Sequence, residues 1–358
     1  MERKEIVQEF FKRGHLLTEE ALVALEGRTQ DISGPLPFII EARDVRTPYR
    51  IIKNITQIKK EITKDDFVKF YNSKYEKMKE IITSRLQKDF VSLNKIDSTR
   101  REMHVIGIVK DIRDREGGKT VDLEDTTTSV PVIFEDTEDL ELDDVVAIRA
   151  VAGGRVLYGK KILYPDIPLR SPTTGTGKAC FISDICLDEV PEKEIEGFFE
   201  WFGQQSIRYL FISGKVGDRA TLDRYVERHC YMKTVFVIAQ GEIPQTPDAY
   251  SSKIVSLSNP AMIEVGGIKV LMMQKGDTKV LKKRHLGKSR TILDEDVLVL
   301  DEVPDIMHTG NSNEPSVTNY KSVTLVNSGS TMGEFRPIVV DFATRDVDKV
   351  HLKGPIEA

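Results

Sequence analysis

The chain has 358 residues, which is too long for one typical domain and favours two or three domains of ~100–200 residues each. Charged residues make up 30% and apolar residues 40%, a composition that argues against a disordered or fibrous protein. The 52 basic and 57 acidic residues leave a net charge of -5. This balance excludes a chain-wide electrostatic attraction to nucleic acid and leaves room only for a local basic patch.

The three cysteines, Cys180, Cys186 and Cys230, form no CxxC pair, which argues against a zinc ribbon and against a disulfide framework. We expect reduced thiols in a cytoplasmic protein. The charged N-terminal segment lacks the apolar core of a signal peptide, and no stretch approaches ~18 uncharged apolar residues. The sequence therefore predicts no membrane span and no membrane partner.

Residues 1–60 are expected to form a helical N-terminal region. Ile6, Phe10 and Phe11 recur at helical spacing, which favours one apolar helix face. The sequence SGPLPF at 33–38 is typical of a turn.

Residues 61–100 are expected to form a helical linker. Thr63 and Asp66 resemble a capping box, with Asp in place of the usual Glu or Gln. Apolar side chains then follow at steps of three or four, which predicts one packed face of a long helix. These side chains are Phe67, Phe70, Tyr71, Tyr75, Met78, Ile82 and Leu86.

In residues 101–170 the apolar pattern changes to a period of two. Five short strand-like runs joined by glycine turns predict a small closed barrel of the oligonucleotide-binding (OB) type. Such barrels often bind single strands through aromatic side chains and basic grooves, and both features are scarce here. The segment FEDTEDLELDD (134–144) has seven acids in eleven residues and would repel phosphates. We favour a structural or protein-docking barrel over a strand-binding one.

Residues 175–358 alternate strand-like runs, such as CFISDICL (180–187), with helix-like ones, such as EKEIEGFFEWFGQQ (192–205). Continuous apolar strands between amphipathic helices predict an α/β sandwich with buried sheets. We expect the aromatic cluster around Trp201 to pack against a sheet. The turns that follow the strands are where chemistry usually lies in α/β folds.

Those turns resemble the motifs of calcineurin-like metallophosphoesterases, which are D-x-H, G-D-x-x-D, G-N-H-D, a lone H and G-H-x-H. In that family two metal ions, of the manganese or iron class, activate a water that attacks phosphorus. The matching segments here are ISDIC, SGKVGD, AQGEIP, MMQKG and HTGNSN. The motif positions are Asp184, Cys186, Lys215, Asp218, Glu242, Ile243, Lys275, Asn311 and Asn313.

Most of the ligands that this resemblance implies are replaced. Cys186 stands for a histidine, Asn311 and Asn313 stand for two more, and Lys215 stands for the bridging carboxylate. A lysine between two metal cations would be repelled by both. We therefore predict no intact catalytic site and no metal cofactor, with Asp184 and Glu242 as the residual candidate ligands.

We expect Asp184 and Asp218 to stabilise the pocket instead. They would bond to backbone amides or to a buried Lys215, which would replace the metal charge with a salt-bridge network. His308 precedes the ligand positions of the last motif, and we expect it to pack as a support of that turn.

The flanks of the motifs resemble the small subunit of archaeal family D DNA polymerase. The segments are LSNPAMIEVGGIKVLMM (257–273), KVLKKRHLG (279–287), EVPDIMHTG (302–310) and YKSVTLVNSGS (320–330). The resemblance is good over residues 100–345 and weak before them. It implies a large catalytic subunit as partner, contact with DNA through that complex, and links to the sliding clamp or primase.

The same family usually supplies a proofreading 3′–5′ exonuclease from the phosphoesterase site, whereas related eukaryotic B-subunits have eroded sites and act as scaffolds. The leading hypothesis is therefore an accessory subunit that has lost the exonuclease. One alternative is a divergent exonuclease that holds a divalent metal through an unusual ligand set. Another is a free-standing inactive paralogue that binds nucleic acid or protein.

The segment TKVLKKRHLGKSR (278–290) is the densest basic run in the chain. It is expected to contact either DNA phosphates or an acidic patch of the large subunit, or else to be a solvated helix face. The contact candidates are Lys282, Lys283, Arg284, His285 and Lys288.

Overall fold

A computed structural model of the chain describes most of the sequence, in two compact units, Met1–Arg50 and Ile51–Ala358. No described helix is long and apolar enough to cross a membrane. The described residues are 3–19, 21–22, 38–40, 49–57, 63–97, 99–137, 139–230, 233–251, 253–289, 295–310, 312–331 and 334–352.

The first unit contains helix α1 (Arg3–Lys12), which buries Ile6 and Phe10 as the apolar spacing predicts. Two short strands, β1 (Leu16–Leu17) and β2 (Ile39–Ile40), pair in parallel in the same unit. The expectation of a purely helical region up to residue 60 is therefore wrong for the described residues. Residues 33–37 of the predicted turn lie outside them.

Helix α4 (Lys64–Leu86) begins at the predicted capping box. The backbone N–H of Thr63 donates to Asp66 Oδ2 (2.7 Å), and Thr63 Oγ1 accepts from the N–H of Asp66 (3.4 Å). These two bonds satisfy backbone donors that a helix start leaves without partners. The predicted face is buried at Phe70, Tyr75, Met78 and Ile82, whereas Phe67 remains 47% exposed.

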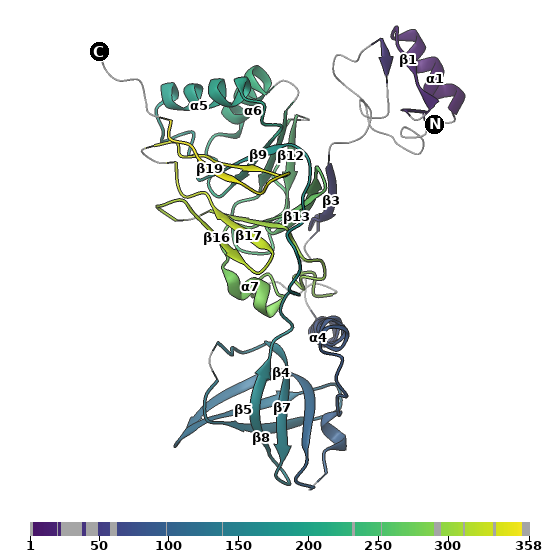
Figure 1. The fold of residues 1–358 in the computed structure, drawn as a ribbon, viewed down its shortest axis with the longest axis vertical. Coiled ribbons are helices and arrows are strands. Elements are labelled where there is room, and N and C mark those ends of the chain that lie inside the picture. Colours follow the sequence, from purple (N-terminus) through teal and green to yellow (C-terminus); the bar gives the residue numbers. More distant parts are fainter. Residues whose placement is uncertain are drawn as a thin grey trace. The chain divides into compact units, whose positions relative to one another are not determined.

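The predicted barrel is present in the second unit, after a short 3₁₀ turn, η1 (Leu93–Lys95) (Figure 1). Its strands close in the order β4-β5-β6-β8-β7, with β6 and β8 parallel. This order is that of a five-stranded Greek-key barrel of the OB type. The strands are β4 (Glu102–Arg115), β5 (Gly118–Glu124), β6 (Ser129–Phe134), β7 (Val145–Ala152) and β8 (Leu157–Leu163).

Two six-stranded sheets form the predicted α/β sandwich. The first has the order β12-β11-β10-β9-β18-β19 and contains β9 (Lys178–Ser183), β10 (Tyr209–Ser213), β11 (Thr234–Ile238), β12 (Ile254–Leu257), β18 (Ile338–Asp341) and β19 (Val347–Lys349). The second has the order β16-β17-β15-β14-β13-β3 and contains β3 (Tyr49–Lys53), β13 (Ala261–Val265), β14 (Ile268–Met272), β15 (Ile306–Thr309), β16 (Ser316–Tyr320) and β17 (Val323–Asn327).

Two segments differ from the expected strands of this sandwich. Residues 49–53, placed in the helical region by the sequence, form the edge strand β3 beside β13. The apolar run VLVL (297–300), whose pattern also predicts a strand, forms a turn at 297–298, where the N–H of Leu298 donates to the side chain of Asp296 (2.8 Å), and a single bridge from Val299 to His285.

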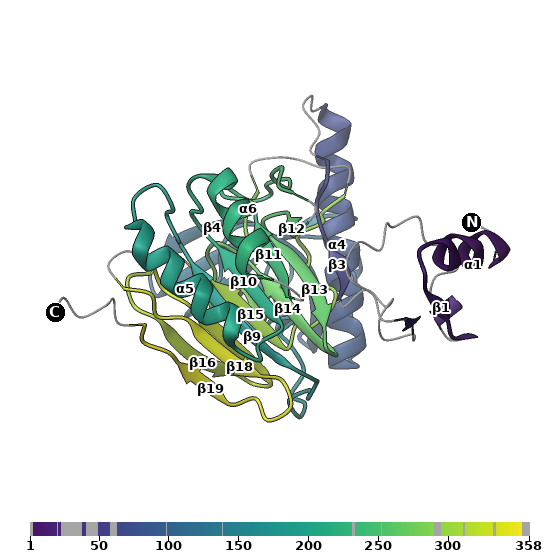
Figure 2. The ribbon, with the colours of Figure 1, turned by 90° about the horizontal axis from the view of Figure 1, so that it is seen from above.

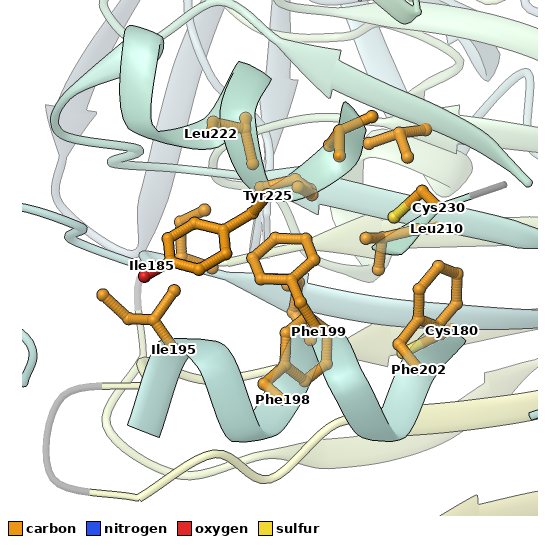
Figure 3. Packing of buried hydrophobic residues seen from close by; sticks show 14 of the residues in the cluster. Cys180, Ile185, Ile195, Phe198, Phe199, Phe202, Leu210, Leu222, Tyr225 and Cys230 are labelled. Carbon is orange, nitrogen blue, oxygen red and sulfur yellow. The ribbon is translucent and has the colours of Figure 1, made fainter. Parts of the chain in front are cut away.

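Helices α5 (Glu192–Gln204) and α6 (Arg219–His229) cover one face of the first sheet (Figure 2). Alternation along the strands explains this arrangement, because Cys180 and Ile182 of β9 point to the helices while Phe181 packs on the second sheet. The aromatic face of α5 is buried against α6 and the sheet, as predicted (Figure 3). Its Phe198 and Phe202 are at most 1% exposed.

Candidate functional site

The motif positions follow strands whose carboxyl ends meet at one edge of the sandwich. In the first sheet β9, β10 and β11 are parallel neighbours, so the loops after them lie side by side. In the second sheet β14 and β15 are parallel neighbours. Gly310, after β15, lies between the loops of the two sheets. Its N–H donates to Gln274 O (3.2 Å) in the second sheet's loops, and a Cβ at this position would lie only 2.6 Å from Ser183 Cβ at the end of β9.

Asp184 accepts a hydrogen bond from a backbone amide of the next loop, which is one of the two predicted arrangements. The backbone N–H of Lys215 donates to Asp184 Oδ1 (2.8 Å), which ties the first two loops together. The Lys215 side chain points instead to Glu189, forms an ion pair with it, and is 38% exposed. The expectation of a buried lysine network between Asp184 and Asp218 is therefore wrong. The carboxylate that neutralises this lysine lies one turn further along the first loop.

Cys186 and Asp218 have local structural roles. Cys186 is 1% exposed, and burial raises the pKa of its thiol, with a smaller contribution from Glu189. The thiolate that would bind a metal is therefore disfavoured. Asp218 caps α6 by accepting from the N–H of Thr221 (3.1 Å), and its pKa is lowered by the hydrogen bond from the Thr221 hydroxyl.

The remaining motif positions lie in exposed or half-buried loops. Glu242, Lys275 and Asn313 are exposed, Ile243 is half-buried, and Asn311 is outside the described residues. Among the described residues no group of three His, Cys, Asp or Glu side chains is arranged to hold a metal ion. The described donor set does not fit a two-metal centre.

Two amides that the sequence did not single out connect the later loops. Asn259 Nδ2 donates to Gly241 O (3.0 Å), and Asn259 Oδ1 accepts from the N–H of Gln274 (3.2 Å). Gln274 Oε1 in turn accepts from the N–H of Gly241 (3.4 Å). Hydrogen bonds between side chain and backbone thus hold the loops after β11, β12 and β14 together.

A polar layer lies between the two sheets beneath these loops. His308 Nε2 lies 2.9 Å from Ser328 Oγ and 3.5 Å from Ser213 Oγ, and Ser328 Oγ donates to Ser183 Oγ (3.0 Å). The His308 ring meets Phe181 edge-on at 5.0 Å. All of these side chains are buried, so the prediction of a packed, supporting His308 is confirmed.

His308 makes folding stability depend on pH. Burial lowers its pKa to about 3, below the unfolded value near 6.5, so the unfolded chain binds the proton first. The stabilisation that neutral His308 contributes is therefore fully present above pH 6.5. Below that pH the free energy of unfolding falls by up to about 1.4 kcal/mol per pH unit. Urea melts between pH 7 and 5 should show a shallower slope for His308→Gln than for the wild type. Titration of the wild-type His308 ring near pH 6.5 in NMR spectra would contradict this prediction.

The basic run meets the acidic segment of the barrel. Lys282 Nζ lies 2.9 Å and Lys279 Nζ 3.3 Å from the Asp139 carboxylate, while Lys288 lies 3.9 Å from Glu141. Lys279 and Lys282 belong to helix α7 (Thr278–Lys283). The run is therefore not a purely solvated face. It joins the sandwich to the barrel of the same chain. These ion pairs neutralise much of the negative charge of the acidic segment, which the sequence predicts to repel phosphates.

The deepest part of this joint is an ion pair. Lys283 Nζ lies 2.8 Å from Asp144, and the two side chains are 11% and 12% exposed. Arg284 is buried and donates to Leu300 O (2.6 Å), while His285 lies 2.8 Å from the buried Asp296. These three predicted contact residues are therefore engaged inside the chain. An external contact through the exposed Lys288 stays a prediction.

A pocket of about 380 Å³ opens beside the loops after β10 and β11, so residues of the segments SGKVGD and AQGEIP line it. Arg219, at the start of α6, pairs with Asp248 (2.6 Å), and its guanidinium lies 5.9 Å from the centre of the Tyr250 ring. Gly214 and Gly217, both with positive φ, line the same pocket.

The strand order and the converging loops define a protein with an OB-type barrel followed by a calcineurin-like phosphoesterase sandwich. No protein-family model matches the chain. The DNA polymerase II small subunit of Methanothermobacter thermautotrophicus is 24% identical over 359 residues, which cover 76% of this chain and 74% of the relative. The protein of the same name from Archaeoglobus fulgidus is 26% identical, with 74% and 70% covered.

The protein of this name from Thermoplasma acidophilum is 23% identical, and 92% of this chain and 86% of the relative are covered. The resemblance to small subunits of archaeal DNA polymerases is therefore confirmed. Among solved structures, an archaeal phosphodiesterase overlaps 49% of this chain and 99% of its own, with 13% identity and a TM-score of 0.34.

Proposed function

We propose that this chain is the accessory small subunit of an archaeal-type family D DNA polymerase. Its work in DNA replication is to stabilise and position a large catalytic subunit, and its place of work is the cytoplasm. The observation that supports this most is the combination of similar small subunits, matched over most of the chain, with site loops held by side-chain hydrogen bonds. A scaffold needs those loops rigid, whereas a two-metal hydrolase needs them to present ligands.

Co-expression with the large subunit from the same genome tests the proposal. We expect a tag on this chain to recover both proteins in near-equal amounts, and the pair to elute together in size-exclusion chromatography with light scattering. The Lys282→Ala variant is a useful control, because its cation already pairs within the chain and its loss should leave co-purification unchanged. Elution of the folded chain alone, with the large subunit elsewhere, would overturn the proposal.

We further propose that the exonuclease is lost and that the loss is not reversed by one residue. Lys215→Asp should leave the protein folded, because Lys215 forms only a half-exposed ion pair with Glu189. It should not gain manganese binding, because Asp184 is held by a backbone N–H and the Cys186 thiol is protonated. Calorimetric titration with Mn²⁺ and digestion of a 3′-labelled oligonucleotide check both points. Stoichiometric Mn²⁺ binding by the wild type would support the divergent exonuclease instead.

A further inference from the structure

One hairpin of the barrel is basic and contains no acidic residue. From Val145 to Pro165 the sequence contains Arg149, Arg155, Lys160 and Lys161 and no Asp or Glu, within a chain of net charge -5. This stretch forms β7, the turn 153–156 and β8.

Three of the four cations of this hairpin are available to bind an external anion. Arg155, Lys160 and Lys161 are exposed, and none has an ion-pair partner among the described residues. Only Arg149 lies near an acid, at 3.8 Å from Glu102. Another cation of the barrel differs, since Lys110 on β4 pairs with Glu124 on β5.

An aromatic ring lies among these cations. Tyr158 of β8 is 47% exposed, and its ring rests against the turn, because a Cβ on Gly153 would lie 2.3 Å from Tyr158 Cε2. Its neighbours across the strands are Val151 and Ile133. The ring is therefore supported from below by backbone and by apolar neighbours, with a large part of it open to solvent.

The fold places this group at a position suited to one kind of ligand. The turn 153–156 joins the fourth and fifth strands of the barrel, and in OB-type barrels this loop borders the oligonucleotide-binding face. Single strands bind such faces by stacking a base on an aromatic ring while cations neutralise phosphates. We propose that hairpin β7–β8 binds single-stranded nucleic acid directly, through Tyr158, Arg155, Lys160 and Lys161.

Two features of the sequence argue against such binding. The first is the acidic segment 134–144, but its Asp139, Glu141 and Asp144 are paired with the basic run of the sandwich. The second feature is the scarcity of aromatic and basic side chains, but hairpin β7–β8 combines one exposed ring with three exposed cations that form no ion pair among the described residues. The inference goes beyond the proposed scaffold role and does not depend on the large subunit.

Fluorescence anisotropy with a labelled oligothymidylate of about 16 nucleotides tests the proposal on the full chain. Tyr158→Ala should weaken binding about 5- to 150-fold with little change in salt dependence, because it removes stacking and no charge. The double variant Lys160→Ala, Lys161→Ala should lower the slope of log affinity against log salt by about 1.4, for two lost phosphate contacts. Lys110→Ala removes one positive charge from an ion-paired site and should leave binding unchanged.

Several outcomes would overturn the inference. They are absence of binding by the wild type at low salt, equal binding by wild type and Tyr158→Ala, and equal loss in Lys110→Ala and the lysine pair. Tighter binding of duplex than of single strands would also contradict it, because paired bases cannot stack on the ring. Co-purification of these variants with the large subunit separates this test from that of the scaffold role, and their thermal melts exclude misfolding.

Discussion

Replacing Lys283 with Glu is expected to lower the free energy of unfolding by about 3–5 kcal/mol. The Lys283–Asp144 pair is almost fully buried where the sandwich meets the barrel, with Glu141 3.3 Å from the same ammonium. Burial raises the pKa of Asp144, and Lys283 opposes that rise, so without the lysine a carboxylate remains there without compensation. Urea unfolding followed by circular dichroism measures the change.

Two further variants locate the effect in this joint. Lys279→Glu alters a more exposed cation of the same run, 46% exposed, and should cost much less. The charge exchange of Lys283→Glu with Asp144→Lys should recover part of the lost stability. An equally small effect of Lys283→Glu and Lys279→Glu would show that the joint does not depend on the buried pair.

Phe198→Ala should destabilise the sandwich by about 3–5 kcal/mol, because it removes a large side chain from a close-packed core. The Phe198 ring is stacked at 5.1 Å on Phe335 and meets Phe199 edge-on at 5.1 Å, and it is 1% exposed (Figure 3). Thermal unfolding followed by calorimetry measures the loss.

The matched control for this substitution is Phe67→Ala, since Phe67 is 47% exposed at the start of α4. We expect a loss of less than about 1.5 kcal/mol there, in proportion to the smaller area removed from water. Equal losses for the two variants would mean that α5 is not the packed element described.

Much of the fold follows from local pattern. The Thr63–Asp66 capping box and the period-two runs of the barrel are signals read within a few residues, and both predictions are confirmed. Strand β3 had no such signal, because five residues at a sheet edge carry too little alternation to be told from a turn. The turn at 297–298 depends on Asp296, whose effect on an apolar run cannot be read from hydropathy.

The site was predictable in position and less so in geometry. Strand ends placed the motif residues correctly, because parallel neighbours bring their loops together whatever the side chains are. The direction of the Lys215 side chain depends on Glu189, which lies 26 residues away on another loop, so no local signal indicates it. The partner of Lys283 lies in another domain, and local composition does not show which acid a lysine meets across a fold.

The parallel pairing of β6 with β8 has a mechanical consequence for the barrel. Two residue pairs alone register these strands, Val132 with Leu157 and Ile133 with Tyr158, whereas the antiparallel pairs run longer. A closed sheet opens first where fewest ladder bonds must break, so this contact is the seam of the barrel. Because Tyr158 lies at that contact, a molecule bound across its ring would hold β6 and β8 together and stabilise the closed barrel.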